Sequence, residues 1–117
     1  MSLLKTEALS SASYIINDNA TISVNTDVKI TINSNSANIT LSDATTIGTI
    51  VFFVPVYDGA VISYKNSSGT SSTFTTTSFQ LIRFIWNGTG YILEKTIEIS
   101  GTDDSGTAFS YQVVERE

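Results

Sequence analysis

The chain of 117 residues has no Cys and no His, contains 17 Ser and 17 Thr, and carries a net charge of −5. The missing residue types exclude disulfides, thiolate or imidazole metal sites, and the Ser-His-Asp and Cys-His catalytic groups. The acidic charge disfavours nucleic acid and anionic membranes as partners. We also expect no cofactor and no bound metal. Val, Ile, Thr and aromatic residues are abundant, which favours an all-β protein.

The first thirteen residues have only weak helical spacing, and we interpret residues 1–13 as an N-terminal arm or connector before a single domain, 14–117. Apolar residues then alternate with polar ones at 20–24, 28–32 and 37–41, which predicts half-buried strands. Turns rich in Asn and Ser separate them. The short spacing between these strands favours an antiparallel meander, and it is too irregular to predict a solenoid repeat.

Two segments in the second half are apolar on both faces of the predicted strand. Residues 50–57 read Ile-Val-Phe-Phe-Val-Pro-Val-Tyr, and residues 79–86 are nearly as apolar. A sheet with one wet face should alternate, so we expect both segments to be covered on both sides. A second sheet of the same chain and a neighbouring subunit are the expected covers.

Turn signals divide the rest of the chain into hairpins. Asn87-Gly88 separates two strands, and a Gly-containing acidic loop at 102–107 separates the last two. The total of about ten short strands predicts two packed sheets or a barrel. We therefore expect an antiparallel β-sandwich of jelly-roll type with about ten short strands.

Carboxylates are the general acids and bases that remain in quantity, but their placement does not predict an active site. We interpret Asp58, Glu94 and Glu98 as solvated surface residues. Asp103 and Asp104 match no complete calcium loop, and a plain turn is the better interpretation. We predict no catalytic residue and no enzymatic activity.

Aromatic side chains are the better candidates for ligand binding. Five of them lie at strand ends or near turns, where an exposed ring could stack on a sugar: Tyr57, Tyr64, Trp86, Tyr91 and Tyr111. We take the first four as candidate ligand-binding residues. The alternative interpretation is that rings at hairpin ends cap the core.

The segment from about residue 20 to residue 95 resembles β-rich domains of bacteriophage tail fibres and related receptor-binding appendages. The similarity lies in the order of 38–44 (Asn-Ile-Thr-Leu-Ser-Asp-Ala), Gly48, 59–64 (Gly-Ala-Val-Ile-Ser-Tyr) and the apolar strand, Gly turn and closing strand of 79–93. It differs at Leu41-Ser42, where Leu-Pro is common, and at Tyr91, where Trp is commoner. The resemblance implies a homotrimer that buries apolar sheet faces between subunits, and it implies no catalytic residue.

These observations lead to one expectation and two alternatives. We expect a structural or receptor-binding module of a phage or prophage tail, located on the virion, with other virion proteins and a host-surface saccharide as partners. Multivalent adhesion would be its mechanism. A monomeric carbohydrate-binding module of a bacterial surface protein is the first alternative, and a small enzyme that uses only carboxylates is the second.

Overall fold

A computed structural model describes residues 8–9 and 13–117, so most of the predicted N-terminal arm lies outside the described residues. The prediction of an all-β protein is confirmed, and the described part contains no helix that could cross a membrane. Its strands are β1 (Ala8–Leu9), β2 (Ser13–Ile16), β3 (Ala20–Val24), β4 (Val28–Ile32), β5 (Asn38–Leu41), β6 (Ile50–Pro55), β7 (Val61–Lys65), β8 (Ser71–Thr75), β9 (Ile82–Trp86), β10 (Tyr91–Thr102) and β11 (Ala108–Arg116).

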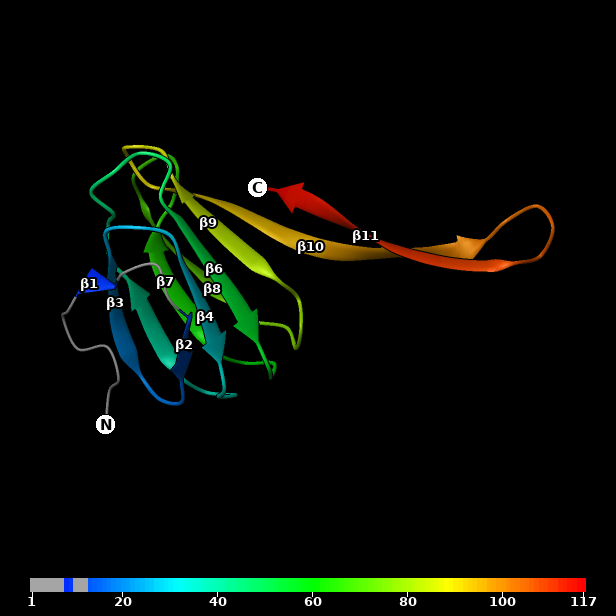
Figure 1. Ribbon diagram of the computed structural model, residues 1–117, viewed down its shortest axis with the longest axis horizontal. Coiled ribbons are helices and arrows are strands. Elements are labelled where there is room, and N and C mark those ends of the chain that lie inside the picture. Colours follow the sequence, from blue (N-terminus) through cyan, green and yellow to red (C-terminus); the bar gives the residue numbers. More distant parts are fainter. Residues whose placement is uncertain (1–7, 10–12) are drawn as a thin grey trace.

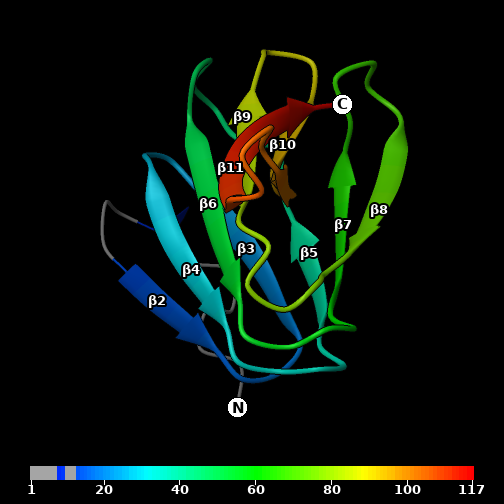
Figure 2. The same cartoon turned by 90° about the vertical axis from the view of Figure 1, so that its right-hand side faces the viewer.

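The strands form two sheets that face each other. One sheet has the order β1-β3-β5-β7-β8, and the other has the order β11-β10-β9-β6-β4-β2. From β2 to β7 the chain changes sheet at every strand, so each coil of the chain adds one strand to each layer. Figure 2 shows β2, β4 and β6 in one layer and β3, β5 and β7 in the other.

Strand direction differs from the expectation. Among the described residues, five of the nine strand pairs are parallel, so the predicted antiparallel meander is wrong for the first half. The physical reason is that sequence neighbours such as β3 and β4 lie in opposite sheets, whereas alternate strands such as β3 and β5 pair. The chain thus winds in coils, although the sequence lacks a regular repeat. Because a jelly roll is antiparallel, the jelly-roll prediction is not confirmed.

The core lies between the two sheets and consists of rows of apolar side chains that the strand register sets side by side. Val28, Val51 and Phe84 form one such row across β4, β6 and β9. Ile39 and Ile62 are neighbours in the opposite sheet. All five are buried, and each buried large apolar side chain stabilises the fold by about 1.5–3 kcal/mol. The alternation in the sequence therefore correctly identified the inward residues.

Part of the outer face of the six-stranded sheet is also apolar, as the double-sided pattern of 50–57 and 79–86 predicts. Ile50, Phe52 and Val54 on β6 and Ile85 on β9 point away from the core and are half-buried. Ile15 on β2, in the same row as Val54, is exposed. We call these five residues the outer apolar face. The expected cover on the inner side is confirmed, and the expected neighbouring subunit on the outer side stays a prediction.

The last two strands leave the two-layer body. β10 pairs with β9 only from Tyr91 to Lys95, and beyond this point it pairs with β11 alone. Figure 1 shows the resulting hairpin extending far from the body, and every residue from 98 to 112 is exposed. We call residues 96–114 the projecting hairpin. The predicted unit 14–117 thus comprises a two-sheet body and this extension.

Polar side chains hold the turns at both ends of the molecule. At the hairpin tip, the Asp103 carboxylate accepts hydrogen bonds from the backbone N–H groups of Ser105 and Thr107, 3.0 and 2.9 Å away. The Ser105 hydroxyl, whose Oγ lies 2.7 Å from the same carboxylate oxygen, lowers the pKa of Asp103 most, and the backbone bonds lower it further, because all of them stabilise the charged form. The carboxylate is therefore engaged within its own loop, in agreement with the interpretation of this segment as a turn.

Candidate functional site: a hydroxyl-lined groove

The four predicted ligand-binding residues do not form one exposed surface. Tyr57 is 47% exposed in the loop after β6. Tyr64, Trp86 and Tyr91 are buried in the core. Trp86 packs edge-on against Tyr91 at a centroid distance of 5.0 Å, and Phe84 contacts both Tyr64 and Tyr91.

Burial changes the interpretation of these rings. The prediction that these residues present an exposed ring for stacking is wrong for Tyr64, Trp86 and Tyr91. They cap the core at one end of the body, which is the alternative interpretation. Tyr91 also donates a hydrogen bond from its hydroxyl to the Ser42 carbonyl oxygen at 2.6 Å, so its polar atom is occupied as well. Tyr57 retains an accessible ring, and Tyr64 borders a groove.

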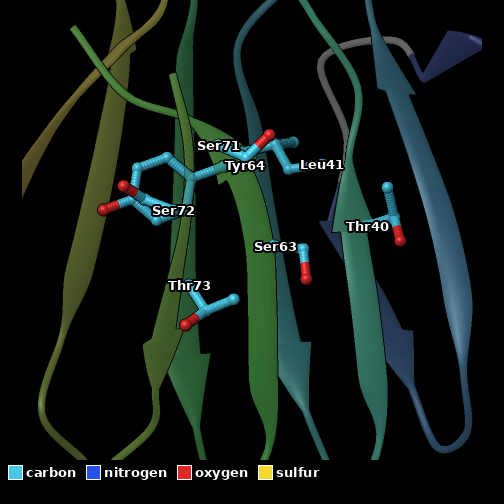
Figure 3. Close-up of a pocket in the computed structure, with 7 residues that line it drawn as sticks. All are labelled: Thr40, Leu41, Ser63, Tyr64, Ser71, Ser72 and Thr73. Atoms are coloured by element: carbon cyan, nitrogen blue, oxygen red, sulfur yellow. The ribbon is translucent and has the colours of Figure 1, made fainter. Parts of the chain in front are cut away.

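This groove lies on the five-stranded sheet and has a volume of about 380 Å³, within the usual range for small-ligand sites. Five of its seven lining residues carry an aliphatic hydroxyl. The lining residues, which Figure 3 shows as sticks, are Thr40, Leu41, Ser63, Tyr64, Ser71, Ser72 and Thr73.

Strand geometry explains why the groove forms at this place. β5 and β7 pair from Asn38 to Thr40, where Thr40 lies opposite Ser63. β5 ends one residue later, at Leu41, whereas β7 continues to Lys65. The sheet therefore opens after the Thr40–Ser63 pair, and the groove occupies this opening.

The strand register also brings the hydroxyl groups together. Thr40 pairs with Ser63, and Ser63 pairs with Thr73 on β8, so three hydroxyls follow one another across the sheet. The row continues outside the groove to Thr21 on β3. Neighbouring strands are about 4.8 Å apart. A molecule with several hydroxyls could therefore exchange hydrogen bonds with successive strands.

Tyr64 joins this groove to a second hollow of about 220 Å³. Tyr64 and Ser72 line both hollows, and Asn66, Leu93 and Glu117 line the second. Burial raises the pKa of the Tyr64 hydroxyl, the negative charge of Glu117 raises it further, and a hydrogen bond with Ser72 opposes the change. The phenol therefore stays protonated in neutral solution and is available as a neutral donor.

The groove's side chains define what it can bind. Its lining residues are Ser, Thr, Tyr and Leu, all uncharged at neutral pH. The nearest ion pair outside the lining joins Lys65 on β7 to Asp43, at 2.7 Å. An uncharged hydroxyl surface with an aromatic and an aliphatic side chain suits a neutral polyol better than an ionic ligand.

These groove residues were not predicted from the sequence, although Ser and Thr are abundant in it. The alternation at 37–41 places Thr40 on the polar face of a half-buried strand, which agrees with its outward orientation in β5. A row across three strands becomes visible only when their register is known, and 33 residues separate Thr40 from Thr73. The local signal that existed was the run of hydroxyl residues at 70–73.

One charged group was also misinterpreted. Glu94, predicted to be a solvated surface residue, is 4% exposed. Its carboxylate lies on the outer side of the six-stranded sheet and accepts hydrogen bonds from the Nε atoms of Arg83 and Arg116, each at 2.8 Å. These bonds lower the pKa of Glu94. Glu94 therefore joins three strands, because Arg83 belongs to β9, Glu94 to β10 and Arg116 to β11.

We found no family model, no curated protein and no solved structure that matches this chain.

Proposed function

We propose that this chain is a non-enzymatic module of a phage or prophage tail that adheres to a neutral saccharide on the host surface through a trimer. The observation that carries the proposal is the groove, whose lining offers hydroxyl groups and two apolar side chains but no charge. Sugars combine hydroxyl groups with apolar ring faces, so this lining complements them. The resemblance of residues 20–95 to tail-fibre domains supports the location on a virion.

A single open groove is expected to bind weakly, which makes multivalency important. Three copies on a rigid assembly would make the second and third contacts intramolecular, and avidity can exceed the single-site affinity by about 10²–10⁴-fold. The outer apolar face, with half-buried Phe52 and Val54, supports assembly with further copies.

The alternative function is that of a monomeric carbohydrate-binding module of a bacterial surface protein. The specific observation in its favour is that one chain supplies all seven lining residues of the groove. Such a module needs no partner copy to complete its site. The two functions share a ligand class and differ in the number of copies that act together.

Glycan-array binding tests the shared ligand class. We expect the wild-type protein to bind neutral glycans and Thr73→Leu to bind at least about tenfold more weakly, since a lost hydrogen bond is equivalent to about 1.4 kcal/mol. Thr21→Leu is the matched control, because Thr21 lies on the same face but outside the groove. Equal binding by the two variants, or a folded wild-type protein that binds no glycan, would contradict the proposal.

Light scattering after gel filtration separates the two functions. A trimer that binds an immobilised glycan much more tightly than a free one supports the phage-tail module. A monomer that binds both forms equally supports the alternative.

A further inference from the structure

The projecting hairpin is amphipathic. Ile97 lies opposite Val113, and Ile99 lies opposite Tyr111. Phe109, the next aromatic on this face, lies opposite Gly101 and covers it, with its ring 3.0 Å from the position that a Cβ would take. The opposite face carries the polar pairs Glu98–Gln112 and Ser100–Ser110. One side of the hairpin is therefore an apolar stripe.

No second layer covers this apolar stripe among residues 13–117, which the structure describes. Tyr111 is 54% exposed, Phe109 is 42% exposed and Ile99 is 36% exposed. Phe109 and Tyr111 stack on each other at a centroid distance of 6.0 Å. Figure 1 shows no strand of the body beside the far part of the β10–β11 hairpin. An isolated two-stranded hairpin is only marginally stable in water. A surface that covers the stripe would stabilise it.

The outer apolar face of the six-stranded sheet is the best complement for the stripe that this chain offers. Phe52 and Val54 provide a flat apolar centre on β6. Next to Phe52 lies a hollow of about 100 Å³, which Leu81 and Val114 line together with Arg83, Glu94, Lys95 and Thr96. An aromatic ring such as that of Tyr111 is of a size to enter this hollow at least partly.

Charge favours the outer apolar face as the cover of the stripe over a second candidate, the projecting hairpin of another copy. Residues 96–114 contain Glu98, Asp103 and Asp104 and no Lys or Arg, so two hairpins packed together would repel each other. On the outer face, Lys29, Phe52, Arg83, Glu94 and Arg116 form one row, so this row carries three positive charges and one negative. Opposite net charges favour contact between hairpin and sheet, and such complementarity mainly determines which surfaces meet.

We propose that the projecting hairpin of one copy lies on the outer apolar face of the six-stranded sheet of a second copy. The hairpin continues its own sheet beyond the body, so it cannot cover that same sheet's outer face. The contact joins two different surfaces and closes into a ring when the rotation between copies permits. The inference rests on the proposed function, which includes an assembly of several copies, and it adds which two surfaces make contact in that assembly.

A mixing experiment tests the inference without knowledge of the detailed contact. The hairpin variant combines Phe109→Ser with Tyr111→Ser, and the face variant combines Phe52→Ser with Ile85→Ser. We expect each variant alone to be monomeric by light scattering. An equimolar mixture should form a 1:1 heterodimer, because one intact hairpin then meets one intact face.

The control replaces the polar side of the hairpin, Ser110→Ala with Gln112→Ala, and should assemble like the wild-type protein. Circular dichroism and thermal unfolding verify that each variant is folded. If a variant does not fold, disulfide cross-linking replaces mixing, since the chain has no Cys of its own. Oxidation of a Tyr111→Cys chain with a Phe52→Cys chain should give a covalent heterodimer, and Ser110→Cys with Phe52→Cys should give at least tenfold less.

The outcomes separate this inference from the proposed function. The inference is overturned, and adhesion by a trimer stays in place, if the wild-type protein is a trimer, the face variant also remains trimeric, and the Tyr111→Cys and Phe52→Cys chains do not cross-link. If the mixed variants form heterodimers but the wild-type protein forms a ring with a number of copies other than three, the inference is supported and the trimer is contradicted. A wild-type protein that stays monomeric overturns both the inference and the trimer, whereas glycan binding decides the ligand class separately.

Discussion

Arg83 on β9 and Glu94 on β10 lie directly opposite each other, with the Arg83 Nε 2.8 Å from the Glu94 Oε1. Arg116 on β11 approaches the other carboxylate oxygen at the same distance. One nearly buried carboxylate thus joins three strands at the root of the projecting hairpin. The two arginines also neutralise the negative charge of Glu94 within the otherwise basic row of the outer face.

Replacement of this carboxylate should weaken the protein in a pH-dependent way. We expect Glu94→Gln to lower the free energy of unfolding by about 2 kcal/mol at neutral pH, because charge-assisted hydrogen bonds are lost. The folded pKa of Glu94 lies below its ordinary 4.5. Its contribution is therefore complete above about pH 4.5 and is lost as the pH falls through the folded pKa.

Urea unfolding at pH 7 and pH 3 measures this effect. The difference between the wild-type protein and Glu94→Gln should shrink at pH 3. Glu98→Gln is the matched control, because Glu98 is exposed on the hairpin and its carboxylate accepts a hydrogen bond from the neutral hydroxyl of Ser110. A difference that stays constant with pH would show that the carboxylate's charge does not stabilise the fold.

The buried hydroxyl of Tyr91 should make the fold sensitive to alkali. Burial raises the pKa of Tyr91, and the negative charge of Asp43 raises it further. The unfolded chain ionises near pH 10 while the folded one does not, so this contribution to stability decreases as the pH rises above about 10. Absorbance of phenolate during a pH titration should show Tyr91 ionising only with unfolding, and Tyr91→Phe should remove this late step.

Two glycines should respond very differently to an added methyl group. A Cβ at Gly90 would lie 1.7 Å from the Asn66 backbone oxygen, whereas a Cβ at Gly48 meets nothing within 4 Å. Gly90→Ala should therefore destabilise the protein by more than about 2 kcal/mol, because backbone must move. Gly48→Ala should cost about 1 kcal/mol through its positive φ alone. Thermal unfolding measures both, and equal costs would contradict the close approach of Asn66 and Gly90.

The centre of the core should be the most sensitive apolar position. Phe84 is fully buried and packs edge-on against Phe53 and Tyr64. Phe84→Ala should cost about 3–5 kcal/mol, from lost burial and the cavity left behind. Ile47→Ala is the control, since Ile47 is exposed in the loop before β6. Urea unfolding of both variants checks the prediction, and a Phe84 cost as small as that of Ile47 would contradict the assigned core.

The inward residues were predictable from the sequence because burial imposes a period of two on each strand. Ile22, Ile30 and Ile39 follow that pattern and are buried as expected. The pairing of these strands was not predictable, since a strand has the same period in a parallel and in an antiparallel sheet. Ile22 and Ile30 are eight residues apart in the chain, yet their strands lie in opposite sheets.

The candidate groove shows the same limit more strongly. Thr40, Ser63 and Thr73 are unremarkable in their own strands, and only the pairing of β5, β7 and β8 makes them neighbours. Trp86 and Tyr91 are conspicuous in the sequence, but a ring at a strand end can point inward or outward. Packing against Phe84 decided that Tyr91 points inward.

Composition and alternation predict an all-β protein without thiol or imidazole chemistry, because both are local properties of the chain. They also predict that 50–57 and 79–86 are strands with two apolar faces. The coiling through two sheets, the groove after Thr40 and the hairpin with an uncovered apolar stripe became visible in the folded protein. These features depend on contacts between distant residues, and local periodicity contains no information about which strands become neighbours.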